Sequence, residues 1–325
     1  MPLFKLDDLS KAAAVVREVV APTPQYCWPQ LSRRAGCEVW VKHENHTPTG
    51  AFKVRGGLVY LDELQRGPEL PSGMITATRG NHGQSIPFAA ARHGVPVTVL
   101  VPEGNSIEKN QAMAGWGAEL VVFGQDFDAA RVEAERRAQD QDFLLVPSFH
   151  PALVRGVATY AHELFTAVGE FDTVYVPIGM GSGICGLITV RDLLGLKTAV
   201  VGVVSSEAAA MAMSLEAGKI VETNSAATFA DGVACRVPMP EPFAIIQAGA
   251  ERIVRVAEDE VADAMRALYS DTHNVAEGAG AAAFAALMQE RELQRGKRVA
   301  VILTGGNVDS SVLQTVLGGG TPDAA

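Results

Sequence analysis

Short apolar runs alternate with longer stretches of helical period from about Val39 onward. Several of the short runs are apolar at nearly every position, which is typical of strands that are buried on both faces of a sheet. We expect strands at residues 39–42, 74–77, 97–101, 119–123, 143–146, 173–177, 198–204, 252–256 and 298–303. We expect helices at residues 54–65, 84–93, 107–115, 126–140, 153–168, 183–194, 259–270 and 278–293. This alternation predicts an α/β fold with helices on both faces of parallel sheets.

The length and composition fit a folded chain of about two domains. The chain has 325 residues, of which 48 % are hydrophobic, and a domain usually has roughly 100–200 residues. A chain of this kind buries a large core, so intrinsic disorder is excluded for most of it. No apolar run approaches the roughly 18 residues that span a bilayer, and we see no secretion signal, so we expect no membrane partner.

Charge and cysteine content indicate the partners and the compartment. The net charge is −10, and basic pairs such as Arg33-Arg34 stand among acidic, small or apolar residues, so we expect no nucleic-acid partner. The 4 cysteines form no CxxC pair and are too few to hold this chain by disulfides. We expect a reduced, cytoplasmic compartment in which the thiols act as buried small hydrophobic groups.

A glycine-rich segment, GMGSGICG at residues 179–186, follows the expected strand 173–177 and opens a helix. Glycines there uncover backbone N–H groups, which bind an anion such as phosphate without a charged side chain. Gly181, Gly183 and Gly186 also match the GxGxxG pattern of dinucleotide-binding folds, with Glu207 at the end of the next strand as a ribose ligand. A third alternative is that these glycines serve only close strand–helix packing. All three alternatives stay open at this point.

A second segment, PTGAFKVRGG at residues 48–57, places Lys53 at the start of an expected helix, in a turn that we expect to face the surface. The helix dipole favours anions at that position and lowers the pKa of a lysine. An uncharged amine is what a Schiff base requires. The alternative is a surface lysine without a chemical role.

Two further motifs follow expected strands. TRGNHGQS at residues 78–85 offers backbone donors, the Asn81 amide and two hydroxyls, which suit a carboxylate ligand, although alone it also fits a capped turn. LTGGN at residues 303–307 ends the last apolar strand. Ligands in open α/β sheets bind at the carboxyl ends of strands, so we expect all four motifs to form one site. The irregular segment 222–243, which contains Asp231-Gly232, is expected to be a long loop near that site.

These four motifs, in this order, resemble the pyridoxal-phosphate enzymes of the tryptophan synthase β fold, and specifically the serine/threonine dehydratase group. The resemblance covers nearly the whole chain, from Thr23-Pro24 to Asn307. It implies two doubly wound open-sheet domains with the cofactor in the cleft between them. We expect a large cofactor-binding domain of residues 1–52 and 151–325, a small domain of residues 53–150, and a homodimer.

The resemblance also implies roles for the motif residues. Lys53 would be the catalytic Schiff-base lysine, Asn81 would bond the 3′-oxygen of pyridoxal 5′-phosphate, and Thr304 would face its pyridine nitrogen. The residues implied in cofactor binding are Phe52, Lys53, Asn81, Gly179, Met180, Gly181, Ser182, Gly183, Gly232 and Thr304. The residues implied in binding the substrate carboxylate are Thr78, Arg79, Gly80 and His82.

The chain departs from the family pattern in the site itself. Ala51 stands where the family usually has Ser, Met180 and Ser182 interrupt a run that is commonly four glycines, and Thr304 replaces Ser or Cys but keeps a hydroxyl. Members that bind a divalent cation use two acids six residues apart, and the positions here are Glu207 and Met213. A thioether is a poor ligand for hard cations, so we expect no metal.

The function that the resemblance implies is a pyridoxal-phosphate-dependent ammonia-lyase, or dehydratase. It would convert a β-hydroxy-α-amino acid to a 2-oxo acid and ammonia by α,β-elimination. The TRGNHGQS and GMGSGICG variants look most like phenylserine or hydroxyectoine-utilisation dehydratases, so the substrate is threonine, serine or a bulkier analogue such as phenylserine. The short stretch after Thr304 leaves no room for the regulatory domain of biosynthetic threonine dehydratases, so we expect a role in amino-acid catabolism.

Other activities stay open. A β-replacement enzyme or a racemase of the same fold would share the cofactor, and an NAD-dependent oxidoreductase would use the glycines at 181–186. Arg79 occupies a position usually held by Ser or Ala, and in racemases a Ser there is the second proton carrier. A guanidinium at that position either binds a carboxylate or lies against an aromatic ring, or it turns outward to a surface acid.

Overall fold

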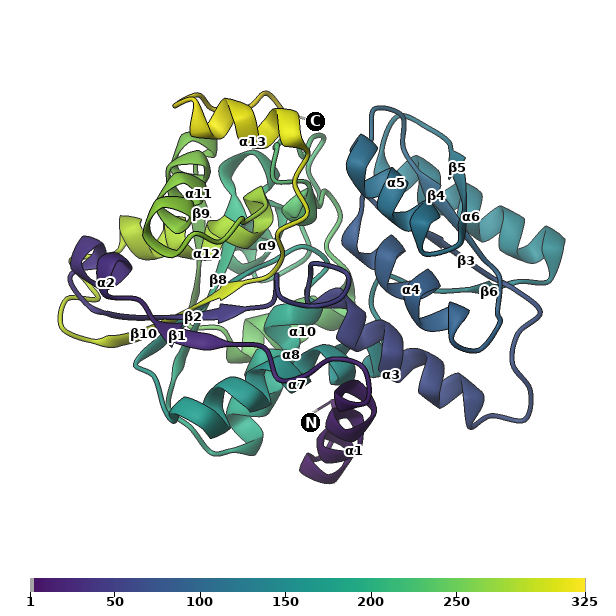
Figure 1. Cartoon of the computed structure of the whole chain (residues 1–325), viewed down its shortest axis with the longest axis horizontal. Coiled ribbons are helices and arrows are strands. Elements are labelled where there is room, and N and C mark those ends of the chain that lie inside the picture. The colour runs from purple at the N-terminus through teal and green to yellow at the C-terminus, as the bar shows by residue number, and fades with distance from the viewer. Residues whose placement is uncertain (1–2, 325) are drawn as a thin grey trace.

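The computed structural model describes residues 3–324 and contains two open sheets side by side (Figure 1). The strands are β1 (Gln25–Cys27), β2 (Glu38–His43), β3 (Met74–Ala77), β4 (Val97–Val101), β5 (Ala118–Val122), β6 (Leu144–Leu145), β7 (Thr173–Pro177), β8 (Ala199–Ser205), β9 (Arg252–Val256) and β10 (Arg298–Leu303). The helices are α1 (Leu6–Arg17), α2 (Pro29–Ala35), α3 (Lys53–Gln65), α4 (Asn81–Ala91), α5 (Ile107–Gly115), α6 (Phe127–Gln141), α7 (Pro151–Val168), α8 (Ser182–Leu193), α9 (Ala210–Ala217), α10 (Pro240–Gly249), α11 (Glu258–Thr272), α12 (Gly278–Gln289) and α13 (Ser310–Leu317). Two 3₁₀ turns, Ser206–Ala208 and Asp231–Val233, follow β8 and precede α10.

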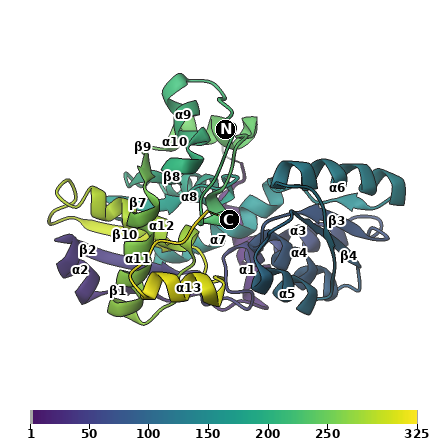
Figure 2. The same ribbon diagram turned by 90° about the horizontal axis from the view of Figure 1, so that it is seen from above.

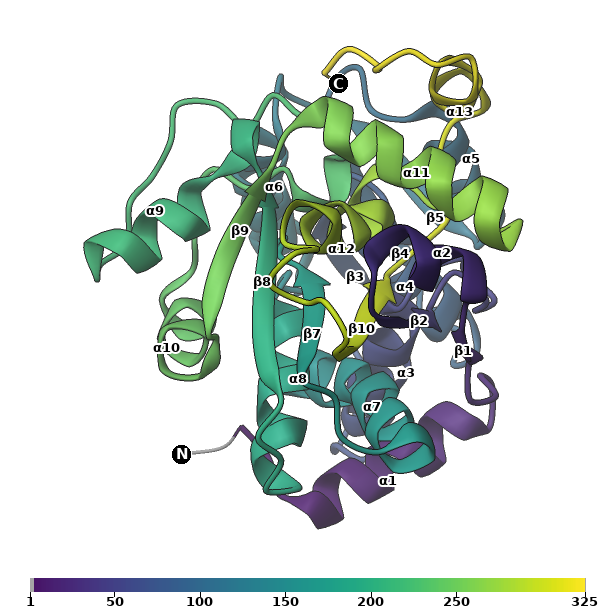
Figure 3. The same cartoon turned by 90° about the vertical axis from the view of Figure 1, so that its left-hand side faces the viewer.

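The larger sheet has six strands in the order β1-β2-β10-β7-β8-β9 (Figure 3). All of its neighbours are parallel except β1, which pairs antiparallel with β2. One face packs against α2, α11, α12 and α13, and the other packs mainly against α7, α8 and α10. Both faces are therefore covered, which explains why β7 is buried at every position.

The smaller sheet has four parallel strands in the order β5-β4-β3-β6. Helices α3, α4 and α5 cover one face, and α6 covers the other. Helix α1 packs against both α3 and α7, where the two lobes meet (Figure 2). The predicted fold class, with two doubly wound open sheets, is confirmed.

Most predicted elements are found within a few residues of their expected limits. The strands at residues 74–77, 97–101, 173–177, 252–256 and 298–303 have the predicted bounds. The segment 222–243 is a loop only as far as residue 239, because α10 begins at Pro240. The predicted domain limits stay a prediction. No helix within residues 3–324 is long and apolar enough to cross a membrane.

A buried ionic network fixes the first turn of α3 to the larger sheet. Arg55 is fully buried, and its guanidinium donates to both carboxylate oxygens of Glu44 (2.7 and 3.0 Å) and of Glu163 on α7 (both 2.8 Å). Lys42 on β2 donates to Glu163 at 2.7 Å. Two cations thus face two anions, and the network joins β2, α3 and α7.

We expect Arg55→Met to destabilise the protein strongly. It leaves Glu44 and Glu163 with less compensating charge in a buried place, and breaking a buried pair in this way costs about 3–5 kcal/mol. The measurement is the free energy of unfolding in urea. Lys11→Met is the control, because it breaks an exposed pair with Asp7 that solvent screens and that contributes little to stability. Equal losses in the two variants would contradict the role of the network.

Candidate active site

The carboxyl ends of β3, β7 and β10 face a single cavity between the two lobes, as the motif positions predict. The start of α3 and the loop before α10 close the cavity. Every residue predicted for the cofactor or the substrate lines it: Phe52, Lys53, Thr78, Arg79, Gly80, Asn81, His82, Gly179, Met180, Gly181, Ser182, Gly183, Gly232 and Thr304. The structure thus brings all of them together, and their individual roles stay proposals.

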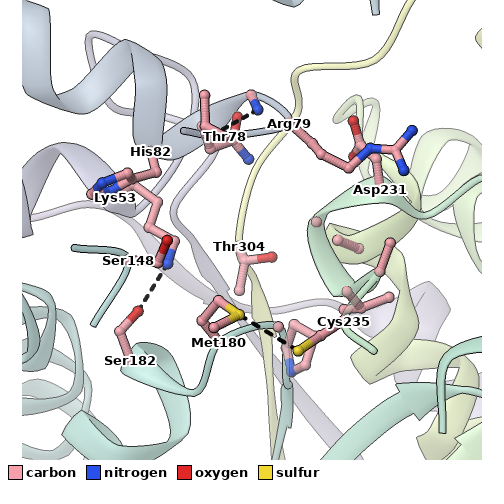
Figure 4. A pocket seen from close by; sticks show the side chains of 18 of the residues that line it. Lys53, Thr78, Arg79, His82, Ser148, Met180, Ser182, Asp231, Cys235 and Thr304 are labelled. Carbon is pink, nitrogen blue, oxygen red and sulfur yellow. Dashed lines mark hydrogen bonds between the residues drawn. The ribbon is translucent and has the colours of Figure 1, made fainter. Parts of the chain in front are cut away.

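Lys53 is the first residue of α3 and points into this cavity (Figure 4). Its Nζ donates to Ser182 Oγ at 2.9 Å and lies 4.9 Å from the centre of the Phe52 ring. Burial lowers the pKa of Lys53 to about 8, because desolvation disfavours the charged amine. The predicted low pKa is confirmed, with burial as its cause. The prediction of a surface-facing turn is wrong, since Ala51 and Val54 are fully buried on either side.

The glycine-rich turn after β7 has the geometry of an anion site. Gly181 has a left-handed φ of 96° and caps α8, which begins at Ser182. A side chain at Gly179 would place its Cβ 2.4 Å from the Gly232 carbonyl oxygen, so only glycine fits there. Helix N-termini leave backbone N–H groups free for a ligand. The turn therefore fits the expected phosphate group, with the Ser182 hydroxyl as an additional partner.

The turn after β3 carries a second set of donors at the start of α4. Thr78 Oγ1 accepts a hydrogen bond from the Gly80 amide at 2.9 Å, which shapes the turn. Burial lowers the pKa of His82 to about 3, so its ring is neutral, and Nε2 is buried without a hydrogen-bond partner among the described residues. An unpaired buried nitrogen beside the cavity is suited to a ligand.

Arg79 points along the cavity wall away from Lys53 (Figure 4). Within residues 3–324 its guanidinium forms no ion pair, and Nε is buried without a hydrogen-bond partner. The alternative that Arg79 turns outward and pairs with a surface acid is therefore not found among these residues. An unpaired guanidinium at the cavity is available to a ligand.

The cavity is also lined by four residues that no sequence motif marks as functional: Lys109, Ser148, Cys235 and Glu277. Glu277 accepts a hydrogen bond from Asn81 Nδ2 at 2.6 Å and lies 3.0 Å from Lys109 Nζ. The one signal in the sequence was a lone acid before the alanine-rich helix α12. Nothing local marks Lys109, because its partners are more than 100 positions away.

The expectation that the thiols are buried holds for Cys37 and Cys185 and is wrong for Cys27, which is exposed. Cys235 lines the cavity with its Sγ 3.5 Å from Met180 Sδ. Met213 packs against the core of the larger lobe, and Glu207 is exposed. In the part of the chain that the structure describes, no cluster of three or more His, Cys, Asp or Glu side chains could hold a metal ion. The prediction of no metal stays a prediction.

Comparisons with known proteins agree with this arrangement. Residues 16–305 match the family described as pyridoxal-phosphate dependent enzymes. An L-threonine ammonia-lyase of Geobacter sulfurreducens is 35 % identical over 88 % of this chain and 71 % of that protein. An L-threo-3-hydroxyaspartate ammonia-lyase of Saccharomyces cerevisiae is 30 % identical over 96 % of both chains. The solved structure of threonine deaminase isoform 2 from Solanum lycopersicum superimposes with a TM-score of 0.87 at 29 % identity, over 97 % of this chain and 94 % of that one.

We expect Lys53→Ala to lose covalent attachment of pyridoxal phosphate and the yellow colour of the holoenzyme, because it removes the amine that we expect to form the Schiff base. Visible absorbance and the mass of the protein after borohydride reduction measure this. The melting temperature is the control for folding, since among residues 3–324 the Lys53 amine makes a single hydrogen bond, to Ser182. A reducible adduct on another lysine would overturn the assignment.

Proposed function

The chain belongs to the family of pyridoxal-phosphate dependent enzymes, and from that premise we propose that it is an ammonia-lyase. It converts a β-hydroxy-α-amino acid to a 2-oxo acid and ammonia by α,β-elimination. One observation carries this proposal. The Lys53 amine, with a pKa near 8, lies between the glycine-rich turn and the donor turn at residues 78–82. The relatives that are named as ammonia-lyases support the reaction class.

The residues of the chain have separate tasks in this reaction. Bound pyridoxal phosphate supplies an electron sink for charge at the substrate Cα. Residues 179–183, including the Ser182 hydroxyl, would hold its phosphate, and Phe52 and Gly232 would line the space for its ring. The amides of residues 78–82, with the side chains of Thr78 and His82, bind the substrate carboxylate, and Lys53 removes the proton from Cα as a general base. Thr304 would offer the pyridine nitrogen a neutral hydroxyl, which would favour loss of the β-hydroxyl group over transamination.

A second chamber supports a substrate larger than serine. A cavity of about 440 Å³ adjoins the site and shares Arg79, Phe127, Met180 and Cys235 with it. This volume far exceeds the space that a methyl group needs. In the shared wall Arg79 and Ser148 are polar, whereas Phe127, Met180 and Cys235 are apolar or sulfur-bearing. Thioethers and guanidinium groups both pack well on aromatic rings. We therefore extend the proposal from serine and threonine to an aryl-substituted substrate such as phenylserine.

The alternatives rest on weaker ground. The dinucleotide alternative needs Glu207 near the ligand, but Glu207 is exposed and does not line the cavity, and Gly186 packs against the Ala158 backbone. A β-replacement enzyme needs a second nucleophile. A racemase needs a second proton carrier, and the arginine side chain is a poor proton carrier near neutral pH as a residue type. These differences separate the activities by experiment.

The proposal includes the setting of the enzyme. We propose a homodimer in a reduced cytoplasm, with an amino acid as its small-molecule partner and a catabolic role. We also keep a large domain of residues 1–52 and 151–325 and a small domain of residues 53–150. The presence of buried free thiols at Cys37 and Cys185 supports the reducing compartment.

Turnover without any added nucleophile tests the reaction. We expect the purified holoenzyme to release a 2-oxo acid and ammonia in equal amounts from serine, threonine or phenylserine, and a coupled dehydrogenase assay with an ammonia assay measures both. An amino-acid product such as cysteine that forms only after sulfide is added to serine would show β-replacement. Conversion of L-serine to D-serine without ammonia would show a racemase.

Arg79→Ala tests the chamber. We expect kcat/KM on phenylserine to fall about tenfold more than on serine, because a desolvated contact between a guanidinium group and an aromatic ring contributes about 2 kcal/mol. Arg131→Ala is the matched control, since Arg131 lines the same chamber but pairs with Glu135. We also expect little D/L interconversion of serine. Equal losses on the two substrates would remove Arg79 from the specificity of the enzyme.

A further inference from the structure

Lys109 is a buried lysine that reaches across the cleft. It lies in the first turn of α5, in the smaller lobe, and its side chain is only 5 % exposed. Its Nζ lies 2.6 Å from Asp231 in the loop before α10 and 3.0 Å from Glu277 at the start of α12, and both partners belong to the larger lobe. Its stem packs so closely on Gly80 that a Cβ there would lie 2.5 Å from Lys109 Cδ.

Glu277 connects this ammonium group to Asn81. Glu277 Oε1 accepts from Asn81 Nδ2 at 2.6 Å, and Asn81 Oδ1 in turn accepts from Asn307 Nδ2 at 2.8 Å. Among residues 3–324, Glu277 Oε2 faces only Lys109. The Asn81 side chain therefore donates from its amide nitrogen to Glu277 and accepts at its amide oxygen from Asn307. These two bonds fix the orientation of the amide. In this orientation its second N–H is left for the cavity.

The protonation state of Glu277 decides whether the Asn81 amide has only this one orientation. An ionised carboxylate only accepts hydrogen bonds, whereas a protonated one also donates, and it then tolerates the flipped amide as well. Burial raises the pKa of Glu277, and the nearby Asp231 carboxylate acts in the same direction. The Lys109 ammonium group opposes both effects. Arg79 and Lys53 also line this cavity, but neither pairs with Glu277.

We infer that Lys109 is a positioning residue: it keeps Glu277 in its acceptor-only form, and Glu277 thereby holds the Asn81 amide with its N–H toward the ligand. This inference rests on the proposed function in one respect. The proposed function identifies that ligand as the 3′-oxygen of the cofactor. Lys109 acts through two other residues and touches neither substrate nor cofactor. The same contacts would have a merely structural role if they served only to dock α5 on the larger lobe.

The chain offers a control for docking alone. The same turn of α5 makes a second, exposed contact across the cleft, in which Glu108 accepts from the Ser310 amide at 2.8 Å. Asp309 caps the α5 turn from the opposite direction, since it accepts from the Ile107 amide at 3.2 Å. Glu108→Gln weakens the docking of α5 without touching Lys109 or Glu277. A purely structural role predicts similar behaviour of Glu108→Gln and Lys109→Met.

The experiment is a double-mutant cycle on the holoenzyme, with Lys109→Met, Glu277→Gln, the double variant and Glu108→Gln. The dissociation constant of pyridoxal phosphate is measured for each variant without substrate. The kcat, the KM and the melting temperature of each variant are then measured as well. We expect each single variant to lose about tenfold in cofactor affinity, because one hydrogen bond loses its fixed geometry. The double variant should lose no more than Glu277→Gln alone, because residues in one network are not additive. Glu108→Gln should keep the parental affinity.

Three outcomes would overturn the inference. These are losses that add in the double variant, an unchanged affinity in Glu277→Gln, or an equal loss in Glu108→Gln. Glutamine has the same size and shape as glutamate, so we expect Glu277→Gln to fold. This variant therefore tests the inference even where Lys109→Met does not fold. Cofactor affinity is measured without turnover, so a parent protein that binds the cofactor but releases no ammonia counts against the proposed function and not against the role of Lys109.

Discussion

The buried arginine at position 55 places a constraint on the whole site. A guanidinium group with no exposed surface is tolerated only where carboxylates and hydrogen bonds compensate its lost hydration, and Glu44 and Glu163 provide them here. Because Arg55 is two residues after Lys53 on the same helix, this requirement also fixes the turn that carries the reactive amine. The Phe52 amide, which donates to the Thr304 carbonyl at 3.0 Å, extends the anchor to the end of β10. The position of Lys53 relative to Thr304 is thus set by charges that never touch the ligand.

Much of this arrangement follows from local sequence, and the rest depends on distant partners. Strand β7 was predictable because both of its faces are buried, which leaves an unbroken apolar run. Strand β1 was missed because it is a short, largely exposed edge strand, so its sequence shows no such run. The motif residues were predictable because the carboxyl ends of parallel strands must meet at one edge. Lys109 was not, because a lysine in an amphipathic helix is ordinary until Asp231 and Glu277 are placed beside it.

The two lobes divide the chemistry between them. The larger one supplies the glycine-rich turn and Thr304, and the smaller one supplies the donor turn at residues 78–82. The chamber beside the site is also shared, since Arg236 of the larger lobe pairs with Asp126 and Asp128 near the start of α6. Those pairs offset part of the negative charge of Asp126 and Asp128, whereas Arg79 forms no ion pair among residues 3–324. The contact between the lobes therefore shapes the chamber, and we propose that Arg79 contributes most to its chemical preference.

The cavity is lined by basic and acidic side chains in similar number. Besides Lys53, these are Arg79 and Lys109 on one side of the balance and Asp231 and Glu277 on the other, while burial lowers the pKa of His82 to about 3, so its ring is neutral. We therefore propose that a phosphate group is held by the backbone N–H groups of the glycine-rich turn and the dipole of α8, without a dedicated cation. Lys109 is paired with Asp231 and Glu277, which leaves Arg79 as the basic residue that we propose contacts the substrate.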